Sequence, residues 1–331
     1  MTDRLRVHVD QQTWKPPYMR LTPEVWAEAA RRRPELAAKL DLTFSDDWTE
    51  IGSRLADADI VICQGKPPEA VVKAAKNLKW IMATSAGIET MAPFDWLPAS
   101  VRLSNNSGTH YPKTKEFAAM ALAMLHFQTP HLATSQRDHA WAPRLDGLIA
   151  GKSVVVVGFG TLGQATAEAA KGLGLEVRAV RRNPASHPLA DSMHAPDDLL
   201  AAAANADFLV CTLPLTETTR GFIGADAFDA LKPGAGVVNI GRGPVMDYTA
   251  LTPRLDDGRL SGAILDVFDK EPLAPESPLW DQKNLTIFPH MSSDDPTSYI
   301  PRSLDIFFEN LDAFLAGAAR LPNEIDRATG Y

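Results

Sequence analysis

The segment that most constrains the fold is residues 154–163, in which four valines are followed by the glycine pattern Gly-Phe-Gly-Thr-Leu-Gly. The valines predict a buried strand, and the glycines stand where a helix has to begin. Gly158 permits a tight turn, Gly160 removes a side chain that would keep an anion off the backbone, and Gly163 lets the helix pack on the strand. The helix would point its N–H groups and its positive dipole end at that anion. The segment therefore predicts a site for the pyrophosphate of a dinucleotide.

The residues on either side support this interpretation. Residues 164–173 carry Ala165, Ala169 and Ala170 as a small-residue packing face, and residues 176–180 predict a second strand. A strand, a glycine turn, a helix and a second strand form the unit in which this glycine pattern binds dinucleotides.

The end of the second strand indicates which dinucleotide binds. An NAD site has an acidic residue there that accepts hydrogen bonds from the ribose, whereas this chain has Arg181 and Arg182 and no carboxylate before Asp191. Guanidinium groups bind a 2′-phosphate through charge-assisted hydrogen bonds. We predict NADP(H) as the preferred cofactor, with NAD(H) as the alternative. If only one arginine binds the phosphate, Arg182 is the better candidate for an ordinary solvated charge.

Length and charge limit the class of protein. A chain of 331 residues is expected to form about two domains. The net charge of −8 argues against nucleic acid as a partner. Cys63 and Cys211 lie in apolar runs, so they predict buried thiols and neither a disulfide framework nor a metal site. The amino terminus lacks the apolar core of a signal peptide, and no apolar run is long enough to span a bilayer, so we expect no membrane partner and a cytoplasmic protein.

Strand-like and helix-like segments alternate along the chain, which is typical of parallel sheets covered on both faces. The strands are expected at residues 4–9, 60–63, 80–83, 154–157, 176–180, 207–213, 236–240, 262–267 and 285–288. The helices are expected at residues 22–40, 113–127, 164–173 and 298–316, whereas residues 131–151 look irregular.

The last expected helix bears on the division into domains. Its apolar residues recur at helical spacing, so it needs a surface to pack on, and the first α/β segment is short of helices. We therefore predict two doubly wound parallel-sheet domains. A Rossmann domain for the dinucleotide, residues 104–296, would be inserted in a flavodoxin-like substrate domain made of residues 1–103 and 297–331.

Four further segments join the glycine loop in a specific resemblance. They are Leu-Pro-Leu-Thr-Glu-Thr-Thr at residues 213–219, Asn-Ile-Gly-Arg-Gly at 239–243, Leu-Asp-Val-Phe-Asp-Lys-Glu-Pro-Leu at 265–273 and Phe-Pro-His at 288–290. In this order the chain resembles the D-isomer-specific 2-hydroxyacid dehydrogenases, the family that includes D-lactate, D-glycerate and phosphoglycerate dehydrogenases.

The resemblance implies three catalytic residues. His290 would donate a proton to the carbonyl oxygen of a 2-keto acid, since imidazole titrates near neutral pH. Glu271 would lie against the other ring nitrogen, where a carboxylate favours the protonated ring and fixes its orientation. Arg242 would bind the substrate carboxylate and polarise the carbonyl. Each residue closes an expected strand on the same edge of the sheet, where ligands of open α/β sheets bind.

The resemblance also implies the remaining binding residues. Asp266 corresponds to the acidic residue that hydrogen-bonds the nicotinamide carboxamide, and Leu213 with Pro214 would line the adenine pocket. The cofactor-binding residues are expected to be Gly158, Gly160, Thr161, Leu162, Gly163, Arg181, Arg182, Leu213, Pro214, Thr219, Ile240 and Asp266. The substrate-binding residues are expected to be Ala86, Gly87, Ile88, Arg242 and His290.

The substrate loop departs from the pattern of the family. Residues 85–89 replace Gly-Ala-Gly-hydrophobic-Asp, a loop whose backbone N–H groups bind the carboxylate, and they carry Ser85 and Glu89 in place of the first glycine and the aspartate. The residues after His290, Met-Ser-Ser-Asp-Asp, also differ from those of many relatives. These departures leave the side-chain preference for the substrate open.

The expected function is NADP(H)-preferring reduction of a small 2-keto acid such as glyoxylate or hydroxypyruvate. Formate oxidation on the same fold is an alternative, although the formate enzymes resemble this chain with Gln at the position of Glu271. A nucleotide-sensing corepressor is the alternative from another class, and the acidic chain without added tails counts against it. The resemblance further implies a homodimer, with residues 113–127 and 131–151 as the contact surface.

Overall fold

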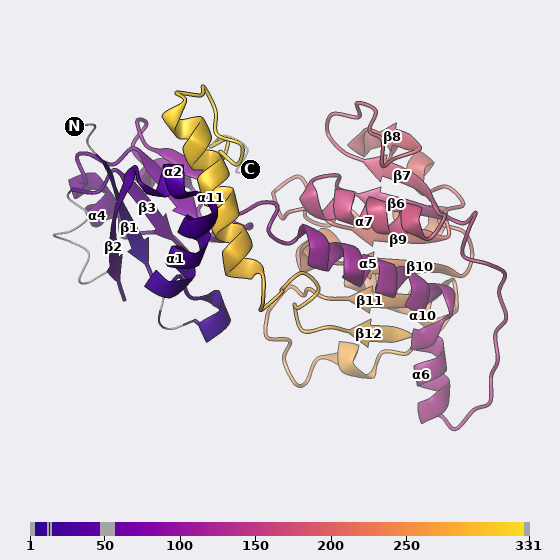
Figure 1. The fold of residues 1–331 in the computed structure, drawn as a ribbon. Coiled ribbons are helices and arrows are strands. Elements are labelled where there is room, and N and C mark those ends of the chain that lie inside the picture. Colours follow the sequence, from indigo (N-terminus) through magenta and orange to yellow (C-terminus); the bar gives the residue numbers. More distant parts are fainter. Residues whose placement is uncertain (1–3, 12, 14, 47–56, 328–331) are drawn as a thin grey trace. The chain divides into compact units, whose positions relative to one another are not determined.

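The computed structural model describes residues 4–11, 13, 15–46 and 57–327. Its packing divides the chain into two compact units, residues 1–109 with 295–331 and residues 110–294. Each unit contains one sheet whose strand pairs are all parallel, with helices packed on both faces (Figure 1). The predicted α/β class is confirmed.

The sheet of the first unit has the strand order β2-β1-β3-β4-β5, which is the order of the flavodoxin-like fold. Its strands are β1 (Leu5–Asp10), β2 (Leu40–Ser45), β3 (Ile60–Cys63), β4 (Trp80–Ala83) and β5 (Arg102–Ser104). Its helices are α1 (Pro23–Arg32), α2 (Pro34–Ala37), α4 (Glu69–Ala74) and α11 (Tyr299–Leu315).

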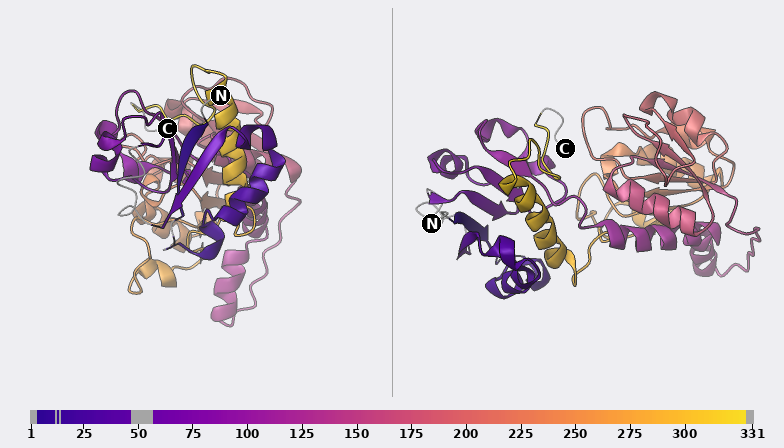
Figure 2. Two further views of the ribbon diagram at one scale, coloured as in Figure 1. Left: turned by 60° about the vertical axis from the view of Figure 1, so that its left-hand side comes forward. Right: turned by 45° about the horizontal axis from the view of Figure 1, so that its top comes forward.

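The core of the first unit explains why the chain returns to it. Alternate residues of β1, β3 and β4 point to one face of the sheet, where they pack against α1 and α11, and the intervening residues of β3 and β4 pack against α4. Phe307 of α11 is fully buried and stacks on Trp80 with ring centroids 5.2 Å apart. Both views of Figure 2 show α11, in yellow, beside the indigo strands and helices of this unit. The apolar stripe of α11 finds the partner surface that its sequence requires.

The second unit has a seven-stranded sheet in the order β12-β11-β10-β9-β6-β7-β8. Counted from β6, this is the Rossmann order with a seventh strand, and the order reverses between β6 and β9. The strands are β6 (Ser153–Val157), β7 (Glu176–Val180), β8 (Ser192–His194), β9 (Phe208–Cys211), β10 (Ala235–Asn239), β11 (Leu260–Leu265) and β12 (Leu285–Ile287). The helices are α5 (Tyr111–His126), α6 (Thr129–Arg137), α7 (Thr161–Gly172), α8 (Leu199–Ala203), α9 (Ala225–Ala230) and α10 (Tyr248–Asp256).

The structure corrects several predicted elements. The helix expected over residues 22–40 stops at Arg32, Pro34 starts the short helix α2, and Leu40 already belongs to β2. Proline removes a backbone donor from the helix and restricts the residue before it, so a break here is expected. Residues 131–137, predicted to be irregular, lie in α6. Strands β2, β5 and β8 were not predicted.

The chain crosses between the units after Thr109 and again before Asp295, whereas the sequence placed these crossings near residues 103 and 297. The later first crossing has a structural reason. Residues 105–107 are held to the first unit by Asn323, whose backbone oxygen accepts from the N–H of Asn105 at 3.1 Å. The Asn323 side chain also donates to the backbone oxygen of Ser107 at 2.6 Å.

Cys63 and Cys211 are buried free thiols in the cores of the two units, as predicted. Burial raises the pKa of Cys211 to about 12, so this side chain serves as an apolar packing group. Within the described residues, no helix has the length and apolar character needed to cross a membrane.

Candidate active site

The glycine loop after β6 has the geometry that its sequence predicts. Gly158 adopts a φ of +95°, a conformation that L side chains rarely adopt. A Cβ on Gly163 would lie 2.0 Å from the backbone oxygen of Gly158, whereas a Cβ on Gly160 would meet nothing within 4 Å. Helix α7 begins at Thr161 directly after this opening, followed by Leu162 in its first turn. The backbone therefore fits the phosphates of a dinucleotide at the amino end of a helix.

The end of β7 carries cationic side chains. Arg181 is half-buried and its Nε donates to the backbone oxygen of Asn183, and Arg182 is exposed. Asp191, the next carboxylate along the chain, accepts from the N–H of Val177 at 2.8 Å, and a hydrogen bond from Lys171 lowers its pKa. Asp191 is thus held near the start of β7, whereas the acidic residue that accepts from the ribose in an NAD site follows the end of that strand.

The loop after β9 is shaped by its own threonines. The hydroxyl of Thr219 donates to the backbone oxygen of Pro214 and accepts from the N–H of Thr216, both at 2.7 Å. Leu213 and Pro214 remain half-buried at the start of this loop. The predicted adenine-binding residues therefore lie on a turn closed by Thr219, and the hydroxyl of Thr219 is committed to that turn.

Arg242 follows β10 between two glycines that are fixed by close backbone contacts. A Cβ on Gly241 would lie 2.6 Å from the backbone oxygen of Leu213, and one on Gly243 would lie 2.2 Å from the carbonyl carbon of Phe268. The guanidinium of Arg242 donates to the backbone oxygen of Gly241 at 2.8 Å and stays partly exposed. The glycines hold this loop against the loops after β9 and β11.

Buried Asn239 and half-buried Tyr248 support the Arg242 loop. The amide of Asn239 donates to the backbone oxygen of Arg242 at 3.2 Å and to the hydroxyl of Tyr248 at 2.9 Å. That hydroxyl donates to the backbone oxygen of Val267 at 2.6 Å, and burial raises the pKa of Tyr248. The contribution of Tyr248 was missed from the sequence, because no local pattern links it to Arg242.

His290 and Glu271 are in direct contact. The Nδ1 atom of His290 lies 2.5 Å from Oε2 of Glu271, whose Oε1 accepts from the N–H of Phe268 at 2.8 Å. The side chain of His290 is 52% exposed and that of Glu271 is 32% exposed. His290 has a φ of +52°, in the left-handed region that non-glycine residues seldom occupy. With Nδ1 bound to the carboxylate, Nε2 remains as the ring nitrogen that can exchange a proton with a substrate.

The carboxylate of Asp266 is buried and holds the residues that follow His290. Its Oδ1 accepts from the N–H groups of Met291 and Ser292 at 2.8 and 3.1 Å, and its Oδ2 accepts from the hydroxyl and the N–H of Ser292 at 2.5 and 3.2 Å. Burial raises the pKa of Asp266, although these hydrogen bonds act to lower it. Asp266 was expected to contact the nicotinamide, and the structure places its oxygens on the backbone next to His290. The side chain of Ile240 is buried in the core.

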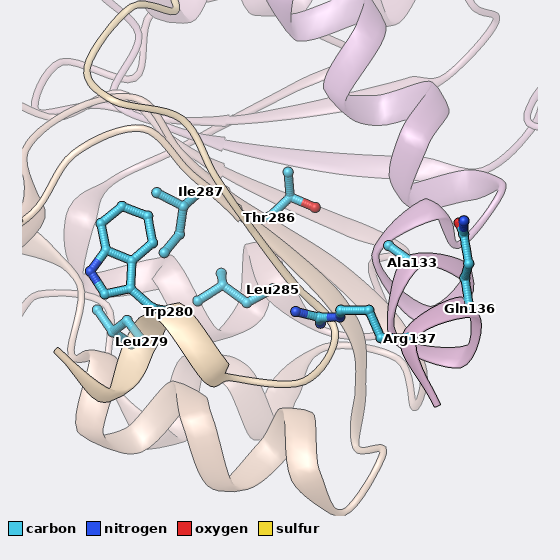
Figure 3. A pocket seen from close by; sticks show the side chains of 8 residues that line it. All are labelled: Ala133, Gln136, Arg137, Leu279, Trp280, Leu285, Thr286 and Ile287. Atoms are coloured by element: carbon cyan, nitrogen blue, oxygen red, sulfur yellow. The ribbon is translucent and has the colours of Figure 1, made fainter. Parts of the chain in front are cut away.

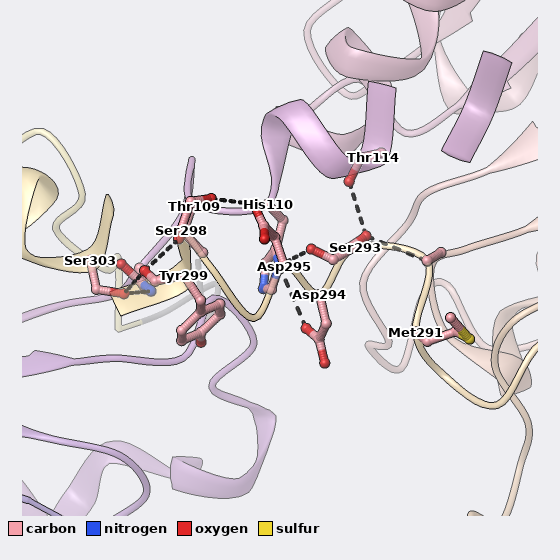
Figure 4. Close-up of polar contacts among 12 residues, drawn as sticks. Thr109, His110, Thr114, Met291, Ser293, Asp294, Asp295, Ser298, Tyr299 and Ser303 are labelled. Carbon is pink, nitrogen blue, oxygen red and sulfur yellow. Dashed lines mark hydrogen bonds and ion pairs between the residues drawn. The ribbon is translucent and has the colours of Figure 1, made fainter. Parts of the chain in front are cut away.

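A second histidine, His110, lies at this end of the second unit and was not found from the sequence. The Nδ1 atom of His110 is 2.9 Å from the backbone oxygen of Ser293 and 3.9 Å from Oδ1 of Asp294 (Figure 4). Because the carbonyl can only accept, Nδ1 carries the proton. Burial lowers the pKa of His110, and the positive charges of Arg242 and His290 act in the same direction.

The predicted substrate loop belongs to the first unit and follows β4. Ala86 and Gly87 are half-buried and Ile88 is 4% exposed. The carbonyl groups of the loop accept hydrogen bonds from Asn105 and from the backbone of Asn106. These hydrogen bonds hold the loop through its backbone carbonyl groups.

A separate groove lies beside the edge strand β12 of the second unit. Its volume is about 590 Å³, and Figure 3 shows Trp280 on one side and Arg137 of α6 on the other. The residues lining it are Ala133, Gln136, Arg137, Leu279, Trp280, Leu285, Thr286 and Ile287. It contains no residue of the predicted catalytic set.

Comparison with known proteins agrees with this geometry. The model of the D-isomer specific 2-hydroxyacid dehydrogenase NAD binding domain matches residues 118–292. An uncharacterised protein of Corynebacterium melassecola is 30% identical over 84% of this chain and 91% of its own length. Glyoxylate/hydroxypyruvate reductase A of Salmonella paratyphi B is 29% identical over 80% of this chain and 85% of its own. A D-isomer specific 2-hydroxyacid dehydrogenase of Xanthobacter autotrophicus, solved with NADPH, has a TM-score of 0.80 at 26% identity and covers 99% of this chain and 100% of its own.

The sheet order, the glycine loop and the His290–Glu271 contact are together typical of a dinucleotide-dependent dehydrogenase fold with a histidine–carboxylate pair at the carboxyl edge of the sheet. The family match covers more than half of the chain. The chain belongs to the D-isomer-specific 2-hydroxyacid dehydrogenase family, and it is an NAD(P)-dependent oxidoreductase that acts on CH–OH groups.

The lowered pKa of His110 predicts a loss of stability in acid. Because the unfolded chain binds this proton at a higher pH than the native protein does, the free energy of unfolding falls as the pH drops below about 6.5. A His110→Gln variant, which keeps a donor for the Ser293 oxygen, is expected to lose less stability between pH 7.5 and 5.5, by at most about 1.4 kcal/mol per pH unit. Urea unfolding at both pH values measures this. His194→Gln, on strand β8, is the control, and parallel curves for wild type and His110→Gln would contradict the assignment.

Proposed function

We propose that this enzyme reduces small 2-keto acids of the glyoxylate and hydroxypyruvate type to D-2-hydroxy acids. The observation that carries the proposal is the 2.5 Å contact between His290 and Glu271 in the unit that holds the glycine loop. Two relatives support the choice of substrate class. They are the reductase of Salmonella paratyphi B and an NADPH-dependent glyoxylate/hydroxypyruvate reductase of Sinorhizobium meliloti, which has a TM-score of 0.78 at 25% identity and covers 99% of this chain and 100% of its own.

The reaction needs a hydride on the carbonyl carbon and a proton on the carbonyl oxygen. The bound dinucleotide supplies the hydride. His290 donates the proton from Nε2, and Glu271 holds Nδ1 so that the ring presents Nε2 to the substrate. Arg242 binds the carboxylate and withdraws charge from the carbonyl. In the oxidative direction the same Nε2 atom accepts the proton from the hydroxyl group.

The proposed cofactor is NADP(H). Arg181 and Arg182 follow β7, and the first carboxylate after them, Asp191, is bound to Lys171 and Val177 near the start of the strand. A 2′-phosphate would therefore meet guanidinium groups and no acidic neighbour in the loop that directly follows β7. The related structures from Xanthobacter autotrophicus and Sinorhizobium meliloti contain NADPH and NADP, which supports this choice. NAD(H) remains the alternative.

The first test is turnover by the purified enzyme with NADPH or NADH and a panel of 2-keto acids. Oxidation of NADPH with glyoxylate or hydroxypyruvate is expected. An absence of oxidation of either nucleotide with every 2-keto acid would remove the reductase proposal and favour a nucleotide-binding role. Formate oxidation would have to be detected separately with NADP and NAD, and Glu271 argues against it.

Replacement of His290 by alanine is expected to lower kcat by roughly 10²–10⁴-fold, because general acid catalysis contributes about that much. The dissociation constant of NADPH is expected to stay within about twofold of wild type, since the glycine loop and Arg181 are untouched. Stopped-flow turnover and fluorescence titration of NADPH measure the two quantities. His194→Ala, on the far edge strand, serves as the control. Loss of NADPH binding together with activity would mean that His290 supports the fold.

Replacement of Arg181 by aspartate is expected to shift preference toward NADH. A hydrogen bond to a charged group contributes about 1.5–3 kcal/mol, so kcat/KM for NADPH relative to NADH should fall roughly ten- to a hundredfold. Arg182→Asp, made in parallel, distinguishes the phosphate ligand from a solvated charge. Arg178→Asp on the same strand is the control, because the Arg178 guanidinium contacts the backbone oxygen of Ala204. Unchanged selectivity in both test variants would place the phosphate elsewhere.

The enzyme is further proposed to form a homodimer through α5 and residues 131–151. This segment exposes large apolar side chains: Trp141 and Leu145 are each 97% exposed and Leu148 is 83% exposed. The backbone beside them is anchored, because Asp146 pairs with Lys152. Exposed apolar side chains on an anchored segment are typical of a surface covered by another molecule. A second copy whose residues 131–151 pack in the groove beside β12 would cover both the exposed apolar side chains and the groove.

The double variant Trp141→Ser, Leu145→Ser is expected to shift the protein from dimer to monomer, because it removes two apolar side chains that would be buried in the dimer interface. Analytical ultracentrifugation over a range of protein concentrations measures the shift. Leu200→Ser is the control, since Leu200 is also exposed, at 48%, but lies on α8. A wild-type monomer at all concentrations, or a variant dimer of unchanged strength, would contradict the proposed surface.

A further inference from the structure

We infer that Asn105, Asn106 and Tyr299 are positioning residues that turn the N–H groups of the substrate loop toward the carboxylate of the 2-keto acid. The inference rests on the proposed function and on the expectation that backbone N–H groups of the loop at residues 85–89 bind that carboxylate together with Arg242. All of these residues belong to the first unit.

Three successive carbonyl groups at the start of the loop are anchored from one side. The backbone oxygen of Thr84 accepts from the hydroxyl of Tyr299 at 2.6 Å and from the amide of Asn106 at 3.1 Å. The oxygen of Ser85 accepts from the backbone N–H of Asn106 at 3.1 Å. The oxygen of Ala86 accepts from the side-chain amide of Asn105 at 2.7 Å.

A hydrogen-bonded carbonyl group also fixes the direction of the N–H group in the same peptide. In a trans peptide the C=O and the N–H point in opposite directions, and the cis bonds of the described chain lie at other positions. Binding of the Thr84, Ser85 and Ala86 oxygens therefore turns the N–H groups of Ser85, Ala86 and Gly87 away from the anchors. Within the described part of the chain, these N–H groups have no hydrogen-bond acceptor. Such a row of donors suits an anion.

The anchors are buried, which makes this orientation the stable one. Asn106 and Ser303 are 0% and 1% exposed, and Asn105 and Tyr299 are 7% and 6% exposed. The Ser303 hydroxyl accepts from the amide of Asn106 at 2.7 Å and donates to the backbone oxygen of Tyr299 (Figure 4 shows Tyr299 beside Ser303). A rotated peptide would leave buried donors without acceptors, which is unfavourable.

The anchors come from the two segments by which the chain crosses between its units. Asn105 and Asn106 precede the crossing after Thr109, and Tyr299 opens α11 just after the return at Asp295. Asn105 also accepts from the N–H of Ser107 at 3.1 Å, so its amide joins the substrate loop to the outgoing segment. The direction of the loop donors thus depends on both crossings.

The test uses Tyr299→Phe, which removes the hydroxyl donor to the Thr84 oxygen, and Asn105→Ala, which removes the amide donor to the Ala86 oxygen. Each is expected to raise the KM for glyoxylate by about two- to tenfold, the effect of one hydrogen bond. The expected kcat changes by less than about twofold, because the loss affects substrate binding and not the acid–base pair. Tyr111→Phe is the matched control, since it removes a 2.6 Å hydrogen bond to Glu168 in the other unit.

Equilibrium binding separates positioning from turnover. Calorimetric titration with oxalate, a two-carbon dianion, is expected to give dissociation constants raised by the same factors as KM, with unchanged affinity for NADPH. Oxalate affinity equal to wild type in both variants would overturn the positioning roles, and a wild type that does not bind oxalate would overturn the loop as an anion site. The wild type could also bind oxalate, lose affinity for it in both variants, and yet turn over no 2-keto acid. That result would uphold the positioning roles and refute the proposed reaction. If either variant fails to fold by circular dichroism, Ser303→Ala replaces it under the same criteria, since it removes the acceptor for the Asn106 amide and the donor to the Tyr299 oxygen.

Discussion

The site of the second unit depends on backbone segments that approach one another more closely than side chains would allow. A Cβ on Gly163 would lie 2.0 Å from the backbone oxygen of Gly158 within the loop after β6, and a Cβ on Gly158 would lie 3.0 Å from the backbone nitrogen of Leu213. A Cβ on Gly241 or Gly243 would lie 2.6 Å from the Leu213 oxygen or 2.2 Å from the Phe268 carbonyl carbon. These contacts join the loops after β6, β9, β10 and β11 along the carboxyl edge of one parallel sheet. Because ligands of open α/β sheets bind at that edge, the glycines set the spacing among the groups that would hold the dinucleotide and the substrate.

The same edge supports an unusual conformation at His290. A φ of +52° is unfavourable for a histidine, by about 1–3 kcal/mol, unless neighbouring groups fix it. Asp266 accepts hydrogen bonds from the two residues after His290, the backbone oxygen of Asp266 accepts from the His290 N–H at 2.9 Å, and Glu271 holds the ring. Backbone strain at this residue is thus balanced by two carboxylates with different tasks. Asp266 is buried and fixes the main chain, whereas Glu271 is partly exposed and orients the imidazole.

The local sequence pattern predicted those elements that are determined by interactions between residues close together in the chain. The four valines and three glycines at 154–163 identify β6, the turn and α7 because each residue acts on its neighbours. Strand β8, with the sequence Ser-Met-His, lacks an apolar pattern and exists because it pairs with β7. The candidate catalytic residues came from a resemblance spread over several motifs. The roles of His110 and of the anchors of the substrate loop were missed because these residues act through hydrogen bonds to residues distant in the sequence. The spacing of residues along the chain does not indicate such contacts.

In the proposed function, the strand order also separates the residues that select the cofactor from those that transfer the proton. Arg181 follows β7, on one side of the point where the order reverses, whereas Glu271 and His290 follow β11 and β12 on the other. β7 and β11 are four strand spacings apart, or about 19 Å at about 4.8 Å per strand. Groups at this separation without shared contacts act additively. In the proposed function, a dinucleotide bound at the glycine loop would therefore be selected at one end through its 2′-phosphate, and the His290–Glu271 pair at the other end would act alike on NADP(H) and NAD(H).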